Sequence, residues 1–113
     1  MTDIRKILVV DDSISIRTFL QISLSGLGYR VLEAETAEKG LETALDQKPH
    51  AIVLDLGLPD RDGLDLLPDL KASLPSTPVL ILTVRNESHY QQLASERGAT
   101  TYMTKPFQIE DLL

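Results

Sequence analysis

Apolar and polar positions along the chain follow two alternating patterns. Five short runs are continuously apolar or strictly alternating, which predicts β-strands over residues 6–10, 29–34, 50–55, 78–83 and 101–105. The segments between them repeat apolar residues every three or four positions, which predicts helices. Those helices are expected over 13–27, between Thr36 and Pro49, over 64–73, over 86–97, and from Phe107 onward.

Glycine and proline refine these boundaries. Gly28 and Gly98 follow the first and fourth predicted helices and are typical of residues that cap a helix C-terminus. Pro68 lies inside the predicted helix 64–73, where it should delay the helix start or kink the helix because it has no N–H. The predicted helix 86–97 has a thin apolar stripe, which indicates poor burial or mobility.

Strands that alternate with helices predict an α/β fold. Runs such as 50–55 and 78–83 are apolar on both faces, as in parallel strands covered by helices on both sides. Right-handed crossovers then favour a doubly wound five-stranded parallel sheet in the order 2-1-3-4-5, the flavodoxin-like arrangement. Its ligands bind at the carboxyl ends of strands 1 and 3. The 113 residues fit one domain, 1–113.

Composition and charge narrow the classes of function. The net charge is −6 and the 11 Lys and Arg residues are scattered, so we expect no nucleic-acid surface, and a partner with a basic docking face is favoured. The absence of Cys excludes disulfides and thiolate metal sites. The apolar runs are too short to cross a membrane, and the N-terminus lacks the apolar stretch of a signal peptide. A cytoplasmic location is therefore expected.

The ends of the predicted strands carry the candidate chemistry. The first strand ends in Asp11 and Asp12, the third in Asp55, the fourth in Thr83 and the fifth in Lys105. Because the carboxyl ends of parallel strands share one edge, three carboxylates, a hydroxyl and an ammonium are expected to converge. Two carboxylates about 4 Å apart repel by roughly 4 kcal/mol at an effective dielectric near 20, so this cluster needs a cation.

An all-oxygen cluster without His or Cys favours a hard ion, and Mg²⁺ suits a site that keeps several waters. With Mg²⁺ bound, the formal charges of the three acids, Lys105 and the ion sum to zero. Such a site could cradle a phosphoryl group, with Asp55 as the nucleophile that forms an acyl phosphate and Thr83 as a hydrogen-bond donor.

Four short motifs resemble the receiver domain of bacterial two-component response regulators: "VVDDS", "VLDLGLPDRDG", "ILT" and "YMTKPF". Their wording is most similar to receivers of winged-helix transcription regulators, and the "DDS...R" opening to chemotaxis-type receivers. Of the acidic pair, the resemblance makes Asp12 the direct metal ligand. The resemblance implies the following roles: phosphoacceptor Asp55; metal ligands Asp11, Asp12, Asp55 and the Gly57 backbone carbonyl; switch residues Thr83 and Tyr102; the site lysine Lys105; and the cis-forming Pro106.

The resemblance also implies a function. A sensor histidine kinase or a phosphotransfer protein would pass a phosphoryl group to Asp55 with Mg²⁺, and the face of helix 4, strand 5 and helix 5 would change to control an output domain or effector. Thr100 and Thr101 stand where acids of a dimer face would be expected, which favours a monomer or weak homodimer. The last helix is expected to continue past Leu113 in a longer protein.

Two rival functions remain at this point. A Mg²⁺-dependent phosphohydrolase with an aspartyl nucleophile needs a similar set of residues, but it needs a second acid where this chain has Gly57. A degenerate receiver would act only as an interaction module and would not be phosphorylated. Neither the proposed switch nor the degenerate module is an enzyme.

Individual residues also have plainer interpretations. Asp11 and Asp12 could cap the first helix, Thr83 could be an ordinary strand residue, and Tyr102 could serve packing alone. The acids of the "PDRDG" segment are interpreted as turn residues and a helix start.

Overall fold

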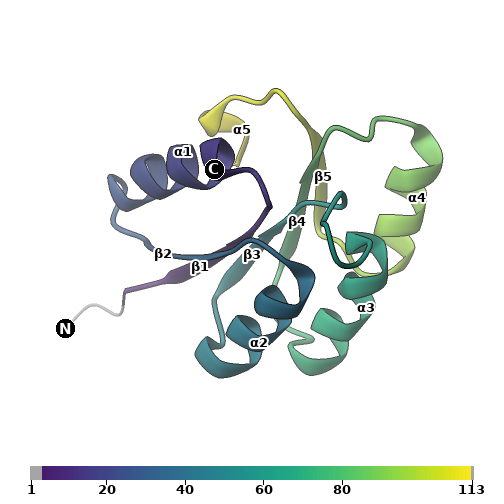
Figure 1. Ribbon diagram of the computed structural model, residues 1–113, viewed down its shortest axis with the longest axis horizontal. Coiled ribbons are helices and arrows are strands. Elements are labelled where there is room, and N and C mark those ends of the chain that lie inside the picture. Colours follow the sequence, from purple (N-terminus) through teal and green to yellow (C-terminus); the bar gives the residue numbers. More distant parts are fainter. Residues whose placement is uncertain (1–3, 113) are drawn as a thin grey trace.

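A computed structural model describes residues 4–112 of the chain. Its five strands form one parallel sheet in the order β2-β1-β3-β4-β5, which confirms the predicted doubly wound topology (Figure 1). The elements in chain order are β1 (Lys6–Val10), α1 (Ile14–Ser25), β2 (Arg30–Ala34), α2 (Ala37–Gln47), β3 (Ala51–Leu54), α3 (Gly63–Ser73), β4 (Val79–Thr83), α4 (Ser88–Glu96), β5 (Thr101–Thr104) and α5 (Ile109–Leu112).

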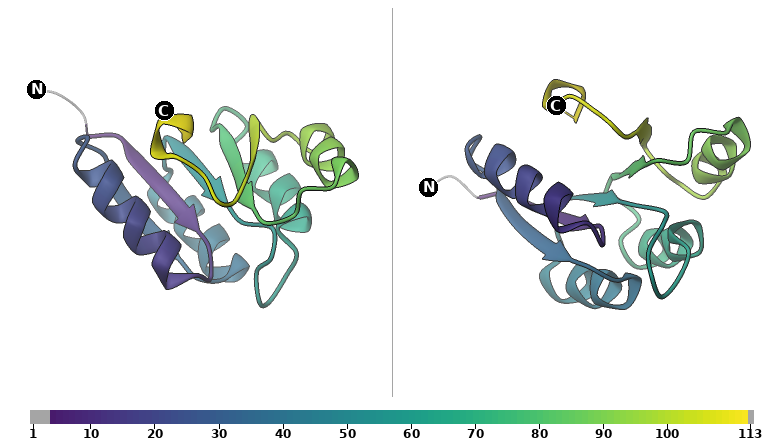
Figure 2. Two further views of the ribbon diagram at one scale, coloured as in Figure 1. Left: turned by 90° about the horizontal axis from the view of Figure 1, so that it is seen from above. Right: turned by 45° about the horizontal axis from the view of Figure 1, so that its top comes forward.

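Helices cover both faces of the sheet. Helices α2, α3 and α4 lie on one face, and α1 and α5 lie on the other (Figures 1 and 2). Successive residues of β1 divide between the two faces, so that Leu8 and Val10 join the larger core cluster and Val9 joins the smaller one. Each fully buried leucine contributes about 1.5–3 kcal/mol of hydrophobic stabilisation, so this double coverage fixes the strands firmly.

Two helix ends differ from the sequence prediction. Helix α1 ends at Ser25, earlier than the predicted residue 27, and Gly26 is its C-cap. Gly28, the predicted cap, instead turns the chain toward β2 with a φ of +95°. Helix α2 is capped by the Thr36 hydroxyl, as predicted, and its C-cap is Lys48 in the left-handed region. Glycine is the usual residue at a left-handed C-cap, so the sequence did not indicate that Lys48 would take this position.

Helix α3 contradicts one of the two alternatives expected for Pro68, a delayed helix start. The helix starts at Gly63 and runs unbroken through Pro68 to Ser73, so the proline does not delay its start. Pro68 has no N–H to donate to the carbonyl of Leu64, four residues earlier. The side chain of Arg97, at the end of α4, supplies the donor instead: its Nη1 lies 2.7 Å from the Leu64 carbonyl oxygen.

The last two helices are shorter than predicted. Helix α4 begins at Ser88 rather than at residue 86, and Ala94 is its buried residue, in keeping with the thin apolar stripe. Helix α5 begins at Ile109 rather than near Phe107. Leu113, on which the expected continuation of this helix rests, lies outside the described residues. Within residues 4–112, no helix has both the length and the apolar character needed to cross a membrane.

Candidate functional site

The strand-end residues meet at the carboxyl edge of the sheet because the backbone ladder extends into them. The Asp11 amide donates to the Ala34 carbonyl at 3.0 Å, and the Asp55 amide donates to the Val10 carbonyl at 2.9 Å. The amide of Lys105 similarly donates to the Thr83 carbonyl at 2.8 Å. The chemistry-bearing side chains are therefore carried by backbone that is fixed by its neighbours in the sheet.

The three predicted acids come together. Asp11, Asp12 and Asp55 each offer a carboxylate oxygen, and these oxygens all lie within 4.8 Å of one another. Asp11 and Asp55 are buried, whereas Asp12 is exposed to solvent. The Lys105 ammonium lies 2.8 Å from Asp11 Oδ2 and 3.4 Å from Asp55 Oδ2, so one cation serves two buried acids. Without a metal, the cluster keeps a formal charge of −2.

The burial and the charges of the cluster shift the pKa values of Asp11 and Lys105. Burial raises the pKa of Asp11; the hydrogen bonds from Lys105 and Ser13 oppose that rise, and the negative charge of Asp55 adds to it. Burial alone would lower the pKa of Lys105, but the hydrogen bond to Asp11 and the charges of Asp55 and Asp11 outweigh it and raise the pKa. Lys105 therefore stays protonated, and the Asp11 carboxylate is harder to ionise than an exposed one.

The first helix does not need the acidic pair as its cap. Ser13 is the N-cap of α1, and its hydroxyl accepts from the Ile16 amide. Asp11 Oδ1 instead accepts from the Ser13 amide at 2.9 Å, and Arg17 Nη1 donates to the Asp11 carbonyl at 2.7 Å. Ser13 therefore supplies the side-chain cap of α1, and the Asp11 carboxylate is shared between the Ser13 amide and Lys105.

Thr83 and Tyr102 both contact the loop that follows β4. Thr83 is fully buried, and its hydroxyl accepts weakly from the Arg85 amide at 3.4 Å. The Tyr102 hydroxyl donates to the Arg85 carbonyl at 2.6 Å, and its ring packs against the larger core cluster. Burial raises the pKa of Tyr102. The two predicted switch residues thus meet at one residue, Arg85.

The β3–α3 loop brings Gly57 beside Asp55. The Gly57 amide donates to Asp55 Oδ1 at 3.2 Å, and Gly57 forms an isolated antiparallel bridge with Asp62. A Cβ atom at Gly57 would meet no atom within 4 Å, so the glycine leaves open space next to the carboxylate. The peptide bond between Lys105 and Pro106 is cis, as the resemblance implied.

Sequence reasoning missed the tertiary roles of Arg85 and Asp60. Arg85 Nη1 lies 2.9 Å from Asp62 Oδ2, and this ion pair links the β4–α4 loop to the β3–α3 loop. Asp60 accepts from the amides of Ala37 and Glu38 at 2.8 and 3.0 Å, and so caps α2 from a distant loop. The position of Arg85, two residues after the strand-end residue Thr83, was the one feature of the sequence that could have placed it near the site. Asp60 lies in a segment that reads as a local turn, and nothing in that pattern indicates its contact with α2.

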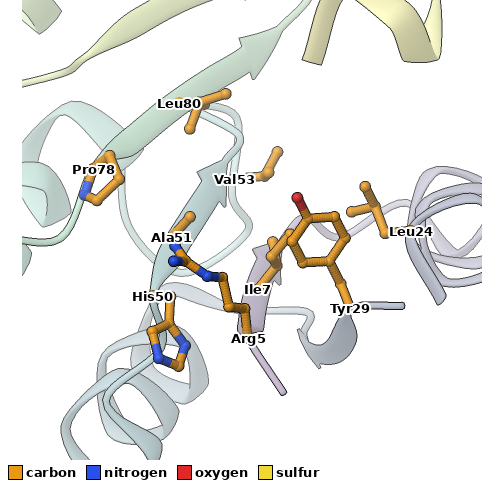
Figure 3. Close-up of a pocket in the computed structure, with 9 residues that line it drawn as sticks. All are labelled: Arg5, Ile7, Leu24, Tyr29, His50, Ala51, Val53, Pro78 and Leu80. Carbon is orange, nitrogen blue, oxygen red and sulfur yellow. The ribbon is translucent and has the colours of Figure 1, made fainter. Parts of the chain in front are cut away.

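A separate pocket of about 280 Å³ lies away from this site. Several of its lining residues, including Arg5, His50 and Pro78, immediately precede β1, β3 and β4, so it opens at the amino-terminal edge of the sheet (Figure 3). None of the lining residues belongs to the acidic cluster.

Comparisons with known proteins show which family the chain resembles. The chain is 44% identical over 106 residues to the KDP operon transcriptional regulatory protein KdpE of Escherichia coli, covering 94% of this chain and 47% of that protein. It is 45% identical over 103 residues to the alkaline phosphatase synthesis transcriptional regulatory protein PhoP of Bacillus subtilis, covering 91% of this chain and 43% of that protein. The chain thus spans less than half the length of these relatives.

Solved structures share the whole fold. A response regulator receiver domain protein (CheY-like) from Methanospirillum hungatei superimposes with a TM-score of 0.94 at 28% identity, covering 97% of this chain and 88% of that chain. Residues 7–113 match the family model described as the response regulator receiver domain. The sheet order, the strand-end acids and these matches agree, and the chain belongs to the family of response regulator receiver domains of two-component systems.

Proposed function

We propose that Asp55 is a phosphoacceptor that receives a phosphoryl group from a sensor histidine kinase or a phosphotransfer protein, with Mg²⁺ as the cofactor. The observation that carries this proposal is the meeting of Asp55 with Asp11 and Asp12 beside the Lys105 ammonium. A carboxylate in such a cluster becomes a usable nucleophile once a metal ion balances the charge around it.

The donor set fits Mg²⁺. The cluster consists of hard carboxylate oxygens, and exposed Asp12 leaves a bound ion in contact with water, which Mg²⁺ favours. Asp11, Asp12 and Asp55 would hold the ion together with the Gly57 backbone carbonyl, and Asp12 would be the direct ligand of the acidic pair. When bound, Mg²⁺ supplies a positive charge that stabilises the oxygens of a transferring phosphoryl group.

The chain's own residues orient the acceptor. Gly57 donates to one Asp55 oxygen, and Lys105 donates to the other. During transfer, an Asp55 oxygen forms a bond to phosphorus while the bond from phosphorus to the donor's imidazole nitrogen breaks, and that nitrogen keeps the electron pair. The Thr83 hydroxyl accepts from the Arg85 amide, so its proton remains available for a phosphoryl oxygen.

The readout that we propose runs through the face of α4, β5 and α5. A phosphoryl dianion in place of one carboxylate charge makes the site one unit more negative, and Thr83 and Lys105 can respond to that change. The relatives are transcriptional regulators about twice as long, which supports control of an output domain or effector. In this proposal the chain acts in the cytoplasm, binds no nucleic acid itself, and does not turn over a substrate.

The phosphohydrolase alternative has little support at the site. Such an enzyme needs a second acid two residues after its nucleophile, and Gly57 offers no side chain there. The degenerate-receiver alternative would require that the cluster be incomplete. In this chain the acceptor, the acidic pair, the hydroxyl and the lysine all reach the same edge.

The test is incubation with acetyl phosphate and Mg²⁺, followed by intact mass measurement. We expect the mass of one added phosphoryl group in the native chain and none in Asp55→Asn, because an amide cannot form the acyl phosphate. Continuous release of phosphate from many esters would identify a phosphohydrolase instead. An unchanged mass would identify a module that is not phosphorylated.

A further inference from the structure

The Arg85 side chain joins the two loops that flank the acidic cluster. From the β4–α4 loop, its Nη1 donates to both oxygens of Asp62, at 3.1 and 2.9 Å. Its Nη2 lies 3.4 Å from the carbonyl oxygen of Leu56, the residue between Asp55 and Gly57. The guanidinium therefore contacts the β3–α3 loop at both of its ends.

Asp62 closes this loop on itself. Its Oδ1 accepts from the Leu64 amide at 2.9 Å and so caps α3, and its backbone is bridged to Gly57. The Gly63 amide donates to the Leu56 carbonyl at 2.8 Å. A Cβ atom at Gly63 would lie 2.5 Å from the Asp55 carbonyl oxygen, so only glycine permits this close approach.

The peptide between Leu56 and Gly57 is thereby held from two sides. Its carbonyl oxygen accepts from the Gly63 amide and also lies against Arg85. The carbonyl of Gly57, one residue further along, is the backbone ligand expected for Mg²⁺. Fixing the first peptide plane restricts the direction of the next carbonyl, because only the φ and ψ of Gly57 separate them.

Arg85 is itself held in place by three other groups. Its guanidinium carbon lies 5.1 Å from the centre of the Tyr90 ring, its carbonyl accepts from Tyr102, and its amide donates to Thr83. The side chain is 25% exposed, so it reaches Asp62 from a largely covered position. A residue held this way can position the loop opposite instead of merely pairing with it.

We propose that Arg85 and Asp62 are positioning residues that hold the β3–α3 loop so that the Gly57 carbonyl stays in place for the divalent cation. This inference rests on the proposed function, because it concerns the same metal site. Neither residue is a metal ligand, and neither belongs to the cluster of Asp11, Asp12 and Asp55.

Electrostatics and positioning make opposite predictions for Arg85 and the same prediction for Asp62. Removing the positive charge of Arg85 near an acidic site should strengthen cation binding if only charge matters, and removing the negative charge of Asp62 should weaken it. If the pair acts by positioning, either change releases the loop and both must weaken binding. The signs of the two effects therefore separate the explanations.

The experiment measures cation affinity directly in the native chain, in three single variants, in the double variant of Asp62→Asn and Arg85→Ala, and in one control variant. Free Mn²⁺, which accepts the same oxygen ligands, is followed by electron paramagnetic resonance and is then displaced by Mg²⁺. The variants are Asp62→Asn, which keeps an acceptor for the Leu64 amide, Arg85→Ala, and Arg85→Lys, which keeps the charge but loses the planar fork. Arg97→Ala is the matched control, because Arg97 likewise contacts a backbone carbonyl and a carboxylate, those of Leu64 and Asp65 in α3, but contacts neither Leu56 nor Asp62.

Substituting a residue that positions a metal ligand typically weakens metal binding by about 10–100-fold. We expect a loss of about three- to tenfold here, because the Arg85–Asp62 pair is partly exposed. Asp62→Asn and Arg85→Ala should both weaken binding, the double variant should lose no more than the stronger single variant, and Arg85→Lys should be intermediate. Arg97→Ala should bind as the native chain does. At saturating Mg²⁺, the acetyl phosphate reaction should remain within about twofold of the native rate, because the acceptor is untouched.

Opposite signs for Asp62→Asn and Arg85→Ala, or unchanged affinity in both, would overturn the positioning role. Equal weakening in Arg97→Ala would also overturn it, because the effect would then be general loosening. Failure of the underlying function gives a different result: the native chain would bind no cation, or would bind it equally well after Asp12→Ala.

Discussion

The Arg97 guanidinium donates to the backbone carbonyl of Leu64, the carbonyl that Pro68 deprives of its helical donor. A side chain from α4 thus completes the hydrogen bonding of α3. This relationship explains how a proline can sit in the middle of a helix whose other face is part of the core.

The first prediction concerns this pairing. Arg97→Ala should lower the free energy of unfolding by about 1–2 kcal/mol, because it leaves a partly buried carbonyl without a donor. In a Pro68→Ala background the amide of residue 68 can donate to Leu64, so the same change at Arg97 should cost roughly half as much. Urea denaturation of the four chains measures the coupling. Equal losses in both backgrounds would show that Arg97 stabilises the chain some other way.

The second prediction concerns the acidic cluster. Asp12→Ala should weaken Mg²⁺ binding and slow phosphorylation without removing the acceptor, because Asp55 remains. Asp55→Asn should abolish incorporation at any Mg²⁺ concentration. Incorporation is measured by intact mass over a Mg²⁺ series. Ordinary stoichiometry in Asp55→Asn would assign the acceptor to another residue.

The third prediction concerns pH and Asp60. Hydrogen bonds from the amides of Ala37 and Glu38 hold the pKa of Asp60 below its usual value of 3.8. Because the folded pKa is the lower one, this contribution to stability is fully present above pH 3.8 and is lost as the pH falls through the folded value. The stability difference between the native chain and Asp60→Asn should therefore be constant near neutral pH and shrink in strong acid. A difference that grew as the pH fell would contradict the capping role.

The fourth prediction concerns coupling from Asp55 to Tyr102. Thr83→Ala should accept the phosphoryl group but fail to change the environment of Tyr102, because the hydroxyl that responds to the phosphoryl group is gone. Thr83→Ser keeps that hydroxyl and is the control. Tyrosine fluorescence or NMR of the Tyr102 ring measures the response. A full response in Thr83→Ala would show that the signal bypasses Thr83.

The fifth prediction concerns oligomeric state. Thr100 and Thr101 stand where a charge-paired dimer face would carry acids, and the Arg97 side chain contacts Leu64 and Asp65 of α3 within the chain. Exposed charge pairs contribute little energy each but determine register, so their absence favours a monomer or weak dimer before phosphorylation. Sedimentation with and without beryllofluoride measures this. A tight dimer in the unmodified chain would disprove it.

The sheet and the acidic site could be predicted from the sequence because each depends on a local pattern. An apolar run defines a strand, parallel order brings strand ends to one edge, and Asp11, Asp55 and Lys105 follow their strands directly. Predicting the positions of those residues required no information about packing between distant parts of the chain.

The residues whose roles the sequence did not indicate have partners that are far away in the chain. Asp60 accepts from the amide of Ala37, 23 residues before it, Arg85 pairs with Asp62, 23 residues before it, and Arg97 reaches 33 residues back to Leu64. The expected delay of the helix start at Pro68 was wrong for the same reason, since local propensity does not account for a hydrogen-bond donor from another helix.

The Arg97 contact also sets how α4 can move. Arg97 ties the carboxyl end of the helix to α3, and buried Ala94 lies close to that end. Among the described residues, no side chain hydrogen bond caps the amino end at Glu87. We therefore expect α4 to tilt about its carboxyl end, while packing such as that of the Tyr90 ring on Arg85 guides its amino end. Nine residues span about 13 Å, so a tilt of about 10° would move the amino end by about 2 Å, beside the loop that carries Arg85.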